Sequence, residues 1–317
     1  MTARAQIWAV TDGRAGIEAQ ALGLAEAVTR RVPSDIVCKR IRLRAPFRAL
    51  PRQLWRDPFA ALASAADALG PPWPDLWIGC GRLSVPFSMA VKRRSAGTFV
   101  VQLQNPRAPL GAFDLVVPPS HDRIESLNVF PILGSPNRID AQALRAPVAY
   151  GAAPVAVLIG GPNKAFRLDA ADAERIAAAL AALQMPLDIT LSRRTPSAAA
   201  EILRRKTAEY AARFFDPSKD SAGANPYPAM LGSARAVLVT EDSVNMAAEA
   251  ASTGKPVYIL PLARKPFASA RKFDAFHEDL RARGASRLFH GEIAAWTYEP
   301  LDETARAADE IIRRWRR

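Results

Sequence analysis

Short, almost uninterrupted apolar runs recur along the first half of the chain, each followed by a loop and then by an alanine-rich stretch. Strands of a parallel sheet that are buried on both faces have this appearance. The pattern therefore predicts βαβ units. We expect strands at residues 6–10, 36–41, 76–79, 99–103, 115–118 and 129–133, and helices at 17–31 and 85–94.

The second half repeats this alternation after a polar connector that contains several Ala and Pro residues. A connector of this composition is typical of a domain boundary. We expect a first domain over residues 1–145, a second over 146–300 and a closing helix over 301–317 that crosses back to the first domain. The second half should contain strands at 155–159, 187–191, 236–240 and 257–260, and helices at 170–183, 197–204, 243–252 and 304–315.

Two such halves predict an α/β fold of two Rossmann-like parallel-sheet domains that face a cleft. Ligands of open parallel sheets bind at the carboxyl ends of the strands, so function should be sought in the loops there. Length and composition agree with this fold, because 317 residues that are 49% apolar and 23% charged can form two cores of roughly 150 residues each.

No stretch approaches the roughly 20 apolar residues of a membrane-spanning helix. The chain begins with a predicted strand instead of the apolar core of a signal peptide, which favours a cytoplasmic protein. Two cysteines and three histidines lack the spacing of a metal site, so we expect no zinc.

The charge of the chain favours an anionic partner. Lys and Arg number 43 against 31 Asp and Glu, a formal net charge of +12. Nucleotide phosphates and the head groups of an anionic membrane would both suit it. An arginine-rich genome would explain part of the excess equally well. Because the sequence has no nucleic-acid-binding motif, we expect no nucleic-acid partner.

The most informative loop follows the predicted strand at 236–240. Its polar side chains can cap the next helix, whose N-terminus attracts phosphate. Glu249, six residues beyond Ser243, could accept two hydrogen bonds from a ribose diol. Helix capping and a solvated surface charge would explain the same residues without a ligand. The candidate nucleotide-binding residues here are Thr240, Glu241, Asp242, Ser243, Asn245 and Glu249.

Two earlier loops should lie at the same edge of the second sheet. Gly160 and Gly161 end a predicted strand, and their missing side chains allow the backbone to approach a phosphate. Asn163 adds a hydrogen-bond donor, and Arg193 adds a guanidinium that could neutralise a diphosphate. A plain glycine turn and an exposed basic turn are the alternatives.

If the chain transfers a sugar and inverts its anomer, a general base must deprotonate the acceptor hydroxyl, and we expect the first domain to supply it. Asp12, after the first strand, is the first candidate, and His121, after a later strand, is the second. Asp12 could equally cap the following helix, and His121 could be an ordinary loop residue. Residues 104–107 offer amides and a guanidinium for recognition of a sugar or an acceptor, or else form a structural turn.

Residues 39–59 interleave six arginines with bulky apolar side chains. A helix of this composition suits the surface of an anionic membrane and would place the protein at the inner face of the membrane, close to a lipid-linked acceptor. The alternative is a segment that packs beside the core while its arginines reach solvent. The apolar members are Phe47, Leu50, Leu54, Trp55 and Phe59.

The spacing of Ser243, Glu249, Gly254 and Pro256 before an apolar strand resembles the donor-binding region of GT-B glycosyltransferases. These include the family that adds N-acetylglucosamine to lipid-linked peptidoglycan precursors. The resemblance implies that Ser243 and its neighbours hold the diphosphate of the donor, and that Glu249 holds the ribose.

A wider resemblance covers nearly the whole chain and points to the mitochondrial-fission Elm-type family. The family name comes from a plant member linked to organelle division, and its proteobacterial members are described as candidate glycosyltransferases. The segments that carry the resemblance are residues 8–16 with Glu18 and Gln20, and residues 104–107, 159–163, 192–196, 225–227 and 240–243.

Pattern and resemblance together predict a metal-independent glycosyltransferase that moves a sugar from a nucleotide diphosphate to a glycan or lipid-linked acceptor. The nucleotide-sugar, for which a UDP-sugar is one candidate, would be a substrate, and we expect no cofactor. A nucleotide-sugar epimerase can use the same two-domain fold and is the second interpretation. The third is a non-catalytic scaffold whose inherited pocket binds a partner or a membrane.

Overall fold

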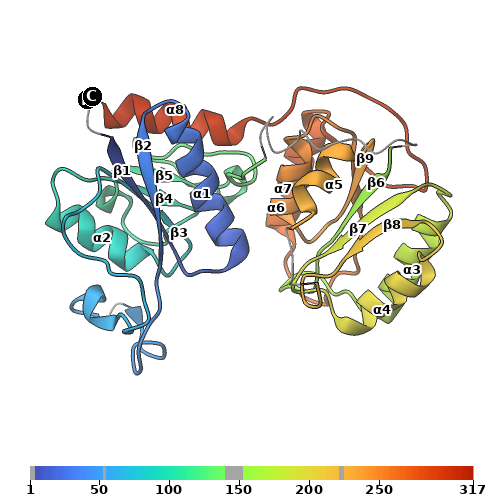
Figure 1. Cartoon of the computed structure of the whole chain (residues 1–317), viewed down its shortest axis with the longest axis horizontal. Helices are drawn as coiled ribbons and strands as arrows, with labels where there is room; N and C mark the ends of the chain where they lie inside the picture. Colours follow the sequence, from blue (N-terminus) through green and yellow to red (C-terminus); the bar gives the residue numbers. More distant parts are fainter. Residues whose placement is uncertain (1–3, 53–54, 140–152, 221–224, 317) are drawn as a thin grey trace. The chain divides into compact units, whose positions relative to one another are not determined.

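The computed structural model describes residues 4–52, 55–139, 153–220 and 225–316, which form two compact units (Figure 1). The first unit contains the described residues up to 138 together with 302–316, and the second contains those from 139 to 301. The predicted boundary at 145/146, and the part of the connector that reaches residue 152, lie outside the described residues.

The first unit is built on a five-stranded parallel sheet with the order β2-β1-β3-β4-β5. The predicted strands are present except the one at 129–133. The elements are β1 (Ala5–Thr11), α1 (Ala15–Thr29), β2 (Ser34–Arg40), η2 (Pro58–Ala61), β3 (Leu76–Cys80), α2 (Val85–Arg94), β4 (Phe99–Leu103), η3 (Leu110–Ala112), β5 (Leu115–Val117), η4 (Ser120–Asp122) and α8 (Glu303–Trp315).

The segment at 129–133 is not a strand of this sheet, which corrects the prediction. It meets β5 and the residues after it through two isolated parallel bridges, Val116 with Val129 and Pro119 with Ile132. Prolines at 119 and 131 have no backbone N–H to donate, so a continuous ladder cannot form. The apolar run still serves the core, because Ile132 is buried.

The last helix of the chain belongs to the first unit, as the sequence predicted. α8 packs along α1 (Figure 1). Its Ala307, Ala308 and Ile311 enter the same core as Leu24 and Val28 of α1. The two alanines leave room for the helices to approach closely. Arg306, Asp309 and Arg313 of α8 are exposed, whereas Glu303 in its first turn is buried and accepts a hydrogen bond from Leu133 N at 3.1 Å.

The described residues between 41 and 57 form turns, bends and irregular structure, not the amphipathic helix predicted within 39–59. The described part of this stretch contains no α-helix, because its prolines remove backbone donors and clash with a preceding helical turn. Its apolar side chains divide between core and solvent: Trp55 is 9% exposed and packs its ring against Phe47 and Phe87, whereas Leu50 is 40% exposed. Leu54 lies outside the described residues.

The second unit is built on a six-stranded parallel sheet with the order β11-β10-β9-β6-β7-β8. The prediction missed β8 and β11, since both are partly exposed and lack a continuous apolar run, and it missed α5 and α7. The elements are β6 (Val155–Ile159), α3 (Ala170–Ala181), β7 (Leu187–Leu191), α4 (Ser197–Lys206), β8 (Ala211–Phe215), α5 (Tyr227–Ser233), β9 (Ala236–Thr240), α6 (Val244–Ala251), β10 (Val257–Leu260), α7 (Arg271–Ala282) and β11 (Ser286–Leu288).

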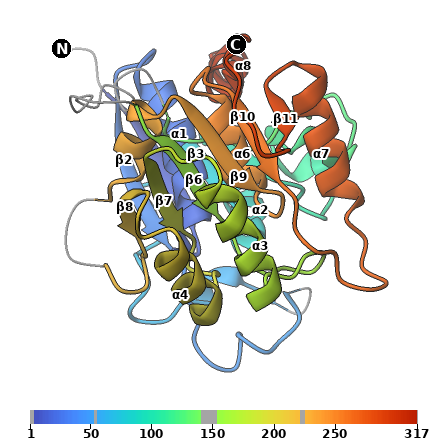
Figure 2. The same ribbon diagram turned by 90° about the vertical axis from the view of Figure 1, so that its right-hand side faces the viewer.

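Helices cover both faces of the second sheet. α3 and α4 pack together on one face, and α5 and α6 lie on the other (Figures 1 and 2). The side chains of β6 alternate between the two covered faces. Val155, Val157 and Ile159 belong to the core beneath α3, and the residues between them point to the opposite face. With both faces covered, a ligand of this sheet must bind at an edge.

Candidate functional site

The second sheet has a topological switch point between β6 and β9. From β6 the chain passes through α3 and α4 to β7 and β8 on one side, and it then returns to β9 on the other side of β6. The loops that follow β6 and β9 therefore leave the sheet next to each other in opposite directions. Open parallel sheets bind ligands at this point.

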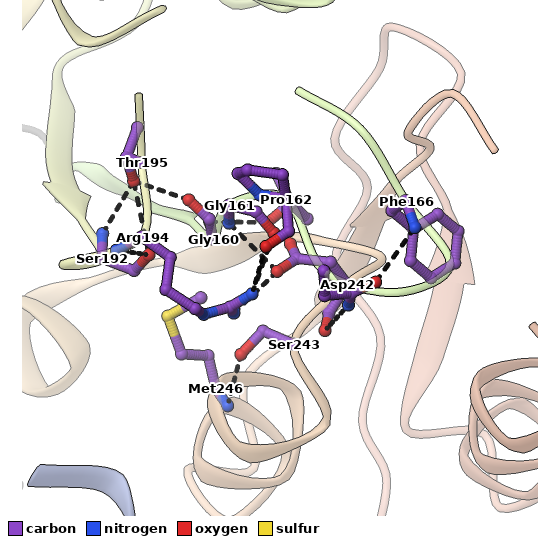
Figure 3. Close-up of polar contacts among 12 residues, drawn as sticks. Gly160, Gly161, Pro162, Phe166, Ser192, Arg194, Thr195, Asp242, Ser243 and Met246 are labelled. Atoms are coloured by element: carbon purple, nitrogen blue, oxygen red, sulfur yellow. Dashed lines mark hydrogen bonds and ion pairs between the residues drawn. The ribbon is translucent and has the colours of Figure 1, made fainter. Parts of the chain in front are cut away.

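Asp242 ties three loops together at the switch point (Figure 3). Its side chain is fully buried. The carboxylate accepts hydrogen bonds from Gly161 N at 3.0 Å, from Thr240 Oγ1 at 2.7 Å and from Arg194 Nη2 at 2.8 Å. A buried carboxylate needs such partners, so Asp242 holds the loops after β6, β7 and β9 in one arrangement.

The two glycines after β6 are required by this packing. A Cβ atom on Gly160 would lie 2.1 Å from Asp242 Oδ1, and one on Gly161 would lie 2.3 Å from the carbonyl oxygen of Arg194. Gly160 N donates to Thr240 Oγ1 at 2.7 Å. The amides expected to face a phosphate therefore serve the protein's own loops, which corrects the role predicted for them.

Asn163 also shapes the loop, contrary to the expectation that it presents a donor to a ligand. Its Oδ1 accepts hydrogen bonds from Ala165 N at 2.7 Å and Phe166 N at 2.9 Å, and its Nδ2 donates to the carbonyl oxygen of Asp242 at 3.3 Å. An asparagine that bonds to nearby backbone in this way fixes a turn.

Of the two adjacent arginines after β7, the structure uses Arg194 in the fold. Besides binding Asp242, its Nη1 donates to the carbonyl oxygen of Gly161 at 2.9 Å. Arg193 is exposed and forms no ion pair with any residue that the structure describes. The spacing of residues in the sequence does not show which of the two guanidiniums points into the protein.

Helix α6 begins at the same edge. Ser243 is its N-cap, and its Oγ accepts a hydrogen bond from Met246 N at 3.4 Å (Figure 3). Asn245 occupies the first turn and is partly exposed. The N-terminus of a helix carries a partial positive charge, so this end of α6 attracts an anion.

Glu241 points away from the end of α6, which corrects its assignment to the phosphate end. Its carboxylate accepts hydrogen bonds from Leu262 N at 3.1 Å and Arg264 Nη2 at 3.2 Å. His277 Nε2 lies 2.8 Å from its carbonyl oxygen, and burial lowers the pKa of that histidine. Glu241 therefore connects β9 to the segments around β10 and α7.

Glu249 lies in the last turn of α6 and is partly buried. Tyr227, the first residue of α5, donates its hydroxyl to Glu249 Oε2 at 2.5 Å. Burial raises the pKa of Glu249 to about 7, although the hydrogen bond from Tyr227 opposes the shift. A carboxyl whose pKa is perturbed in this way is a typical feature of functional sites. The sequence prediction named Glu249 but missed Tyr227, despite its place in the motif at 225–227.

In the first unit, Asp12 follows β1 at the switch point between β1 and β3. Its carboxylate forms an ion pair with Arg14 at 2.7 Å, and its Oδ1 accepts a hydrogen bond from Arg14 N at 3.1 Å. His121 lies in η4 after β5. Two strands separate β1 from β5, a distance of roughly 14 Å at ordinary strand spacing, so the unit does not bring these two candidates together.

Residues 104–107 form a turn, and Arg107 remains exposed. Gln104 Nε2 donates to Gln20 Oε1 at 3.0 Å, and Asn105 Oδ1 accepts a hydrogen bond from Arg107 N at 2.9 Å. Gln104 and Arg107 both have positive φ angles, 66° and 51°. The turn directs the chain from β4 back along the edge of the sheet.

A sequence model of the family described as mitochondrial fission ELM1 matches residues 15–315. The chain belongs to this family. RP120, an uncharacterized protein of Rickettsia prowazekii, is 28% identical, and the match covers 96% of this chain and 97% of that protein. The mitochondrial fission protein ELM1 of Arabidopsis thaliana is 30% identical over 76% of this chain, and the match spans 64% of the plant protein, slightly under two thirds.

Solved structures confirm the predicted GT-B fold of this ELM1-family chain. The glycotransferase of kitacinnamycin matches 99% of this chain and 100% of its own, with a TM-score of 0.51 and 14% identity. UDP-GlcNAc 2-epimerase from Methanocaldococcus jannaschii matches 97% and 98%, with a TM-score of 0.54 and 11% identity. At these identities the likeness is one of fold, which glycosyltransferases and nucleotide-sugar epimerases share.

No helix among the described residues is both long and apolar enough to cross a bilayer. Within the same residues, no three His, Cys, Asp or Glu side chains are grouped closely enough to hold a metal ion.

Proposed function

We propose that the second unit binds the nucleoside diphosphate of a sugar donor and that the protein transfers the sugar to an acceptor hydroxyl without a metal ion. The observation that carries the proposal is the position of Glu249 relative to the start of α6. Six residues of α-helix separate Glu249 from Ser243, a rise of roughly 9 Å. This separation suits a nucleoside diphosphate whose phosphates face the helix N-terminus and whose ribose faces Glu249.

The charges at the switch point support this placement. The positive end of α6 and the exposed guanidinium of Arg193 would stabilise the charge that develops on the leaving diphosphate. Arg194 already neutralises Asp242. A diphosphate would therefore meet positive groups without an opposing buried carboxylate.

We propose Asp12 as the general base and keep His121 as the second candidate. Asp12 lies at the switch point of the first sheet, whereas His121 follows β5 at the edge of that sheet. The ion pair with Arg14 holds the Asp12 carboxylate in one orientation. A base that deprotonates an acceptor hydroxyl needs such positioning.

A thermal-shift screen with UDP, GDP, CDP, TDP and their sugar conjugates tests the donor site. A ligand at 100 times its dissociation constant adds about 2.7 kcal/mol of stability. We expect one nucleotide family to stabilise the protein, and Arg193→Gln and Glu249→Gln to reduce that effect. Glu201→Gln is the matched control, because Glu201 is an exposed glutamate on α4. Wild-type protein that no nucleotide stabilises would refute the donor site and favour a scaffold.

The reaction is tested separately by incubation of the stabilising nucleotide-sugar with the protein. A transferase releases the nucleoside diphosphate only when an acceptor is present. An epimerase converts the nucleotide-sugar to its epimer without an acceptor. Epimer formation in the absence of any acceptor would refute the transfer and establish the alternative.

A further inference from the structure

The first unit contains a cavity of about 500 Å³ that belongs to neither the proposed donor site nor the Asp12 loop. It lies between α2, the loops that follow β3 and β4, and the segment that leads into η2. Both loops leave the carboxyl edge of the first sheet, where open parallel sheets bind ligands. The apolar residues of its wall include Trp55, Val85, Pro86 and Met89.

Four arginines surround this apolar wall, and among the residues that the structure describes no aspartate or glutamate lines the cavity. They are Arg52, Arg82, Arg93 and Arg107, all exposed. Within the described residues, none of the four forms an ion pair with a carboxylate. The neighbouring Arg94 differs, because it pairs with a carboxylate oxygen of Asp57 at 3.1 Å. Unpaired guanidiniums gathered at one cavity favour an anionic occupant.

The guanidinium of Arg52 lies against the backbone of Arg82. Arg52 Nη1 donates a hydrogen bond to the carbonyl oxygen of Arg82. Burial lowers the pKa of Arg52, and the charge of Arg82 lowers it further, while Asp12 opposes the shift. An anion bound beside Arg82 would reduce this repulsion.

The wall that α2 contributes is fixed in place by a buried polar network. Gln102 on β4 accepts a hydrogen bond from Ser88 Oγ at 2.8 Å, and Trp77 Nε1 donates to the same Ser88 Oγ at 2.8 Å. A Cβ atom on Gly79 would lie 2.4 Å from Ser88 Oγ. The network holds α2 close to β3, so the cavity is largely preformed.

We infer that this cavity binds a phosphorylated lipid, with the phosphate or diphosphate held by Arg82 and Arg107 and the hydrocarbon chain on the wall formed by Trp55, Val85 and Met89. Guanidiniums bind phosphate oxygens in bidentate fashion, and the apolar wall adds affinity in proportion to the hydrocarbon area it covers. The further statement that this lipid is the sugar acceptor rests on the proposed function.

Calorimetric titration of the full chain with geranyl diphosphate tests the inference, with inorganic diphosphate and geraniol as probes of the two halves of the ligand. We expect geranyl diphosphate to bind at least about tenfold more tightly than either half, because both contacts act together. The double variant Arg82→Gln/Arg107→Gln should lose about 100-fold in affinity for it. Arg56→Gln is the matched control, since Arg56 is an exposed arginine of the same segment that does not line the cavity.

Met89→Ser should weaken binding of geranyl diphosphate while leaving inorganic diphosphate unaffected, and circular dichroism checks that each variant is folded. Equal affinity of the wild type for diphosphate and geranyl diphosphate would overturn the inference, as would unchanged binding in a folded double variant. Vesicles of phosphatidylglycerol distinguish a bilayer lipid from a free prenyl diphosphate. Vesicle binding that depends on Arg82 and Arg107 supports a bilayer lipid as the ligand. Vesicle binding that is unchanged in the double variant, together with no binding of geranyl diphosphate, overturns the site.

The nucleotide screen is repeated on the double variant. In the double variant we expect nucleotide stabilisation to persist while binding of geranyl diphosphate is lost. In the wild type, stabilisation by nucleotide together with absent binding of geranyl diphosphate would refute this inference alone. Lipid binding together with absent nucleotide stabilisation would refute only the proposed donor site.

Discussion

Replacing Glu249 with glutamine should change how the stability of the protein depends on pH. Glutamine keeps the shape of the side chain and can still accept the hydrogen bond from the Tyr227 hydroxyl. The substitution removes only the titratable carboxyl group. Because burial raises the pKa of Glu249, the folded protein keeps a proton that the unfolded chain releases at lower pH.

The magnitude follows from the pKa in the two states. The pKa is raised from 4.5 to about 7 on folding, and each unit corresponds to about 1.4 kcal/mol. The folded state binds more protons between these values, so its stability falls as pH rises through this window. The free energy of unfolding of the wild type, relative to Glu249→Gln, should therefore decrease by about 3 kcal/mol between pH 4.5 and pH 7. The difference should be constant below and above the window.

Urea unfolding at a series of pH values from 4 to about 8.5 measures this difference, with the linear extrapolation applied to each variant. Glu201→Gln is the matched control, because an exposed glutamate should show no such trend. If the difference between wild type and Glu249→Gln stays flat across the window, the Glu249 carboxyl is not buried against Tyr227 as described. A difference that increases with pH would reverse the sign and refute the reasoning entirely.

Three further predictions concern packing contacts inside each unit. Gly160→Ala should destabilise the protein by about 2 kcal/mol, because the new methyl group overlaps Asp242, and urea unfolding would show this as a lower midpoint. Ile311→Ala should cost about 3 kcal/mol by leaving a cavity between α8 and α1, and a thermal melt unchanged from wild type would contradict the docking of α8. Arg194→Gln should lower the unfolding free energy by about 1 kcal/mol, because loss of the partly exposed guanidinium leaves the buried Asp242 carboxylate without its ion-pair partner. Arg193→Gln should leave the unfolding free energy unchanged, and equal effects of the two variants would contradict the inward position of Arg194.

The elements that the sequence predicted well are those whose burial is continuous. β6, β7 and β9 are buried at every position, so their apolar runs stand out from the loops around them. β11 has two exposed residues out of three, and it is held by pairing with β10 instead of by its own composition. Residues 41–57 were misjudged for a different reason. Their composition suited an amphipathic helix, but their prolines, visible in the sequence, exclude one.

At the site, the sequence located the loops but not the contacts between them. The carboxylate that fills the space beside Gly160 comes from Asp242, 81 residues after Gly161 along the chain. Tyr227 reaches Glu249 across 22 residues. Neither pairing has a spacing rule, because each depends on how strands are ordered in the sheet. The same limit explains why the internal ion pair of Arg194 with Asp242 was not foreseen.

If the second unit binds a nucleoside diphosphate as proposed, a glutamate is better suited than a glutamine to position 249. Asp242 is neutralised by Arg194, so the positive end of α6 would remain available to the diphosphate. With a pKa of about 7, Glu249 holds its proton in a substantial fraction of molecules near neutral pH. Two ribose hydroxyls that donate hydrogen bonds to the carboxylate would favour its ionised form and lower that pKa. Nucleotide binding would then release a proton and offset the destabilisation that the carboxylate imposes on the empty protein, a coupling that an amide at this position cannot provide.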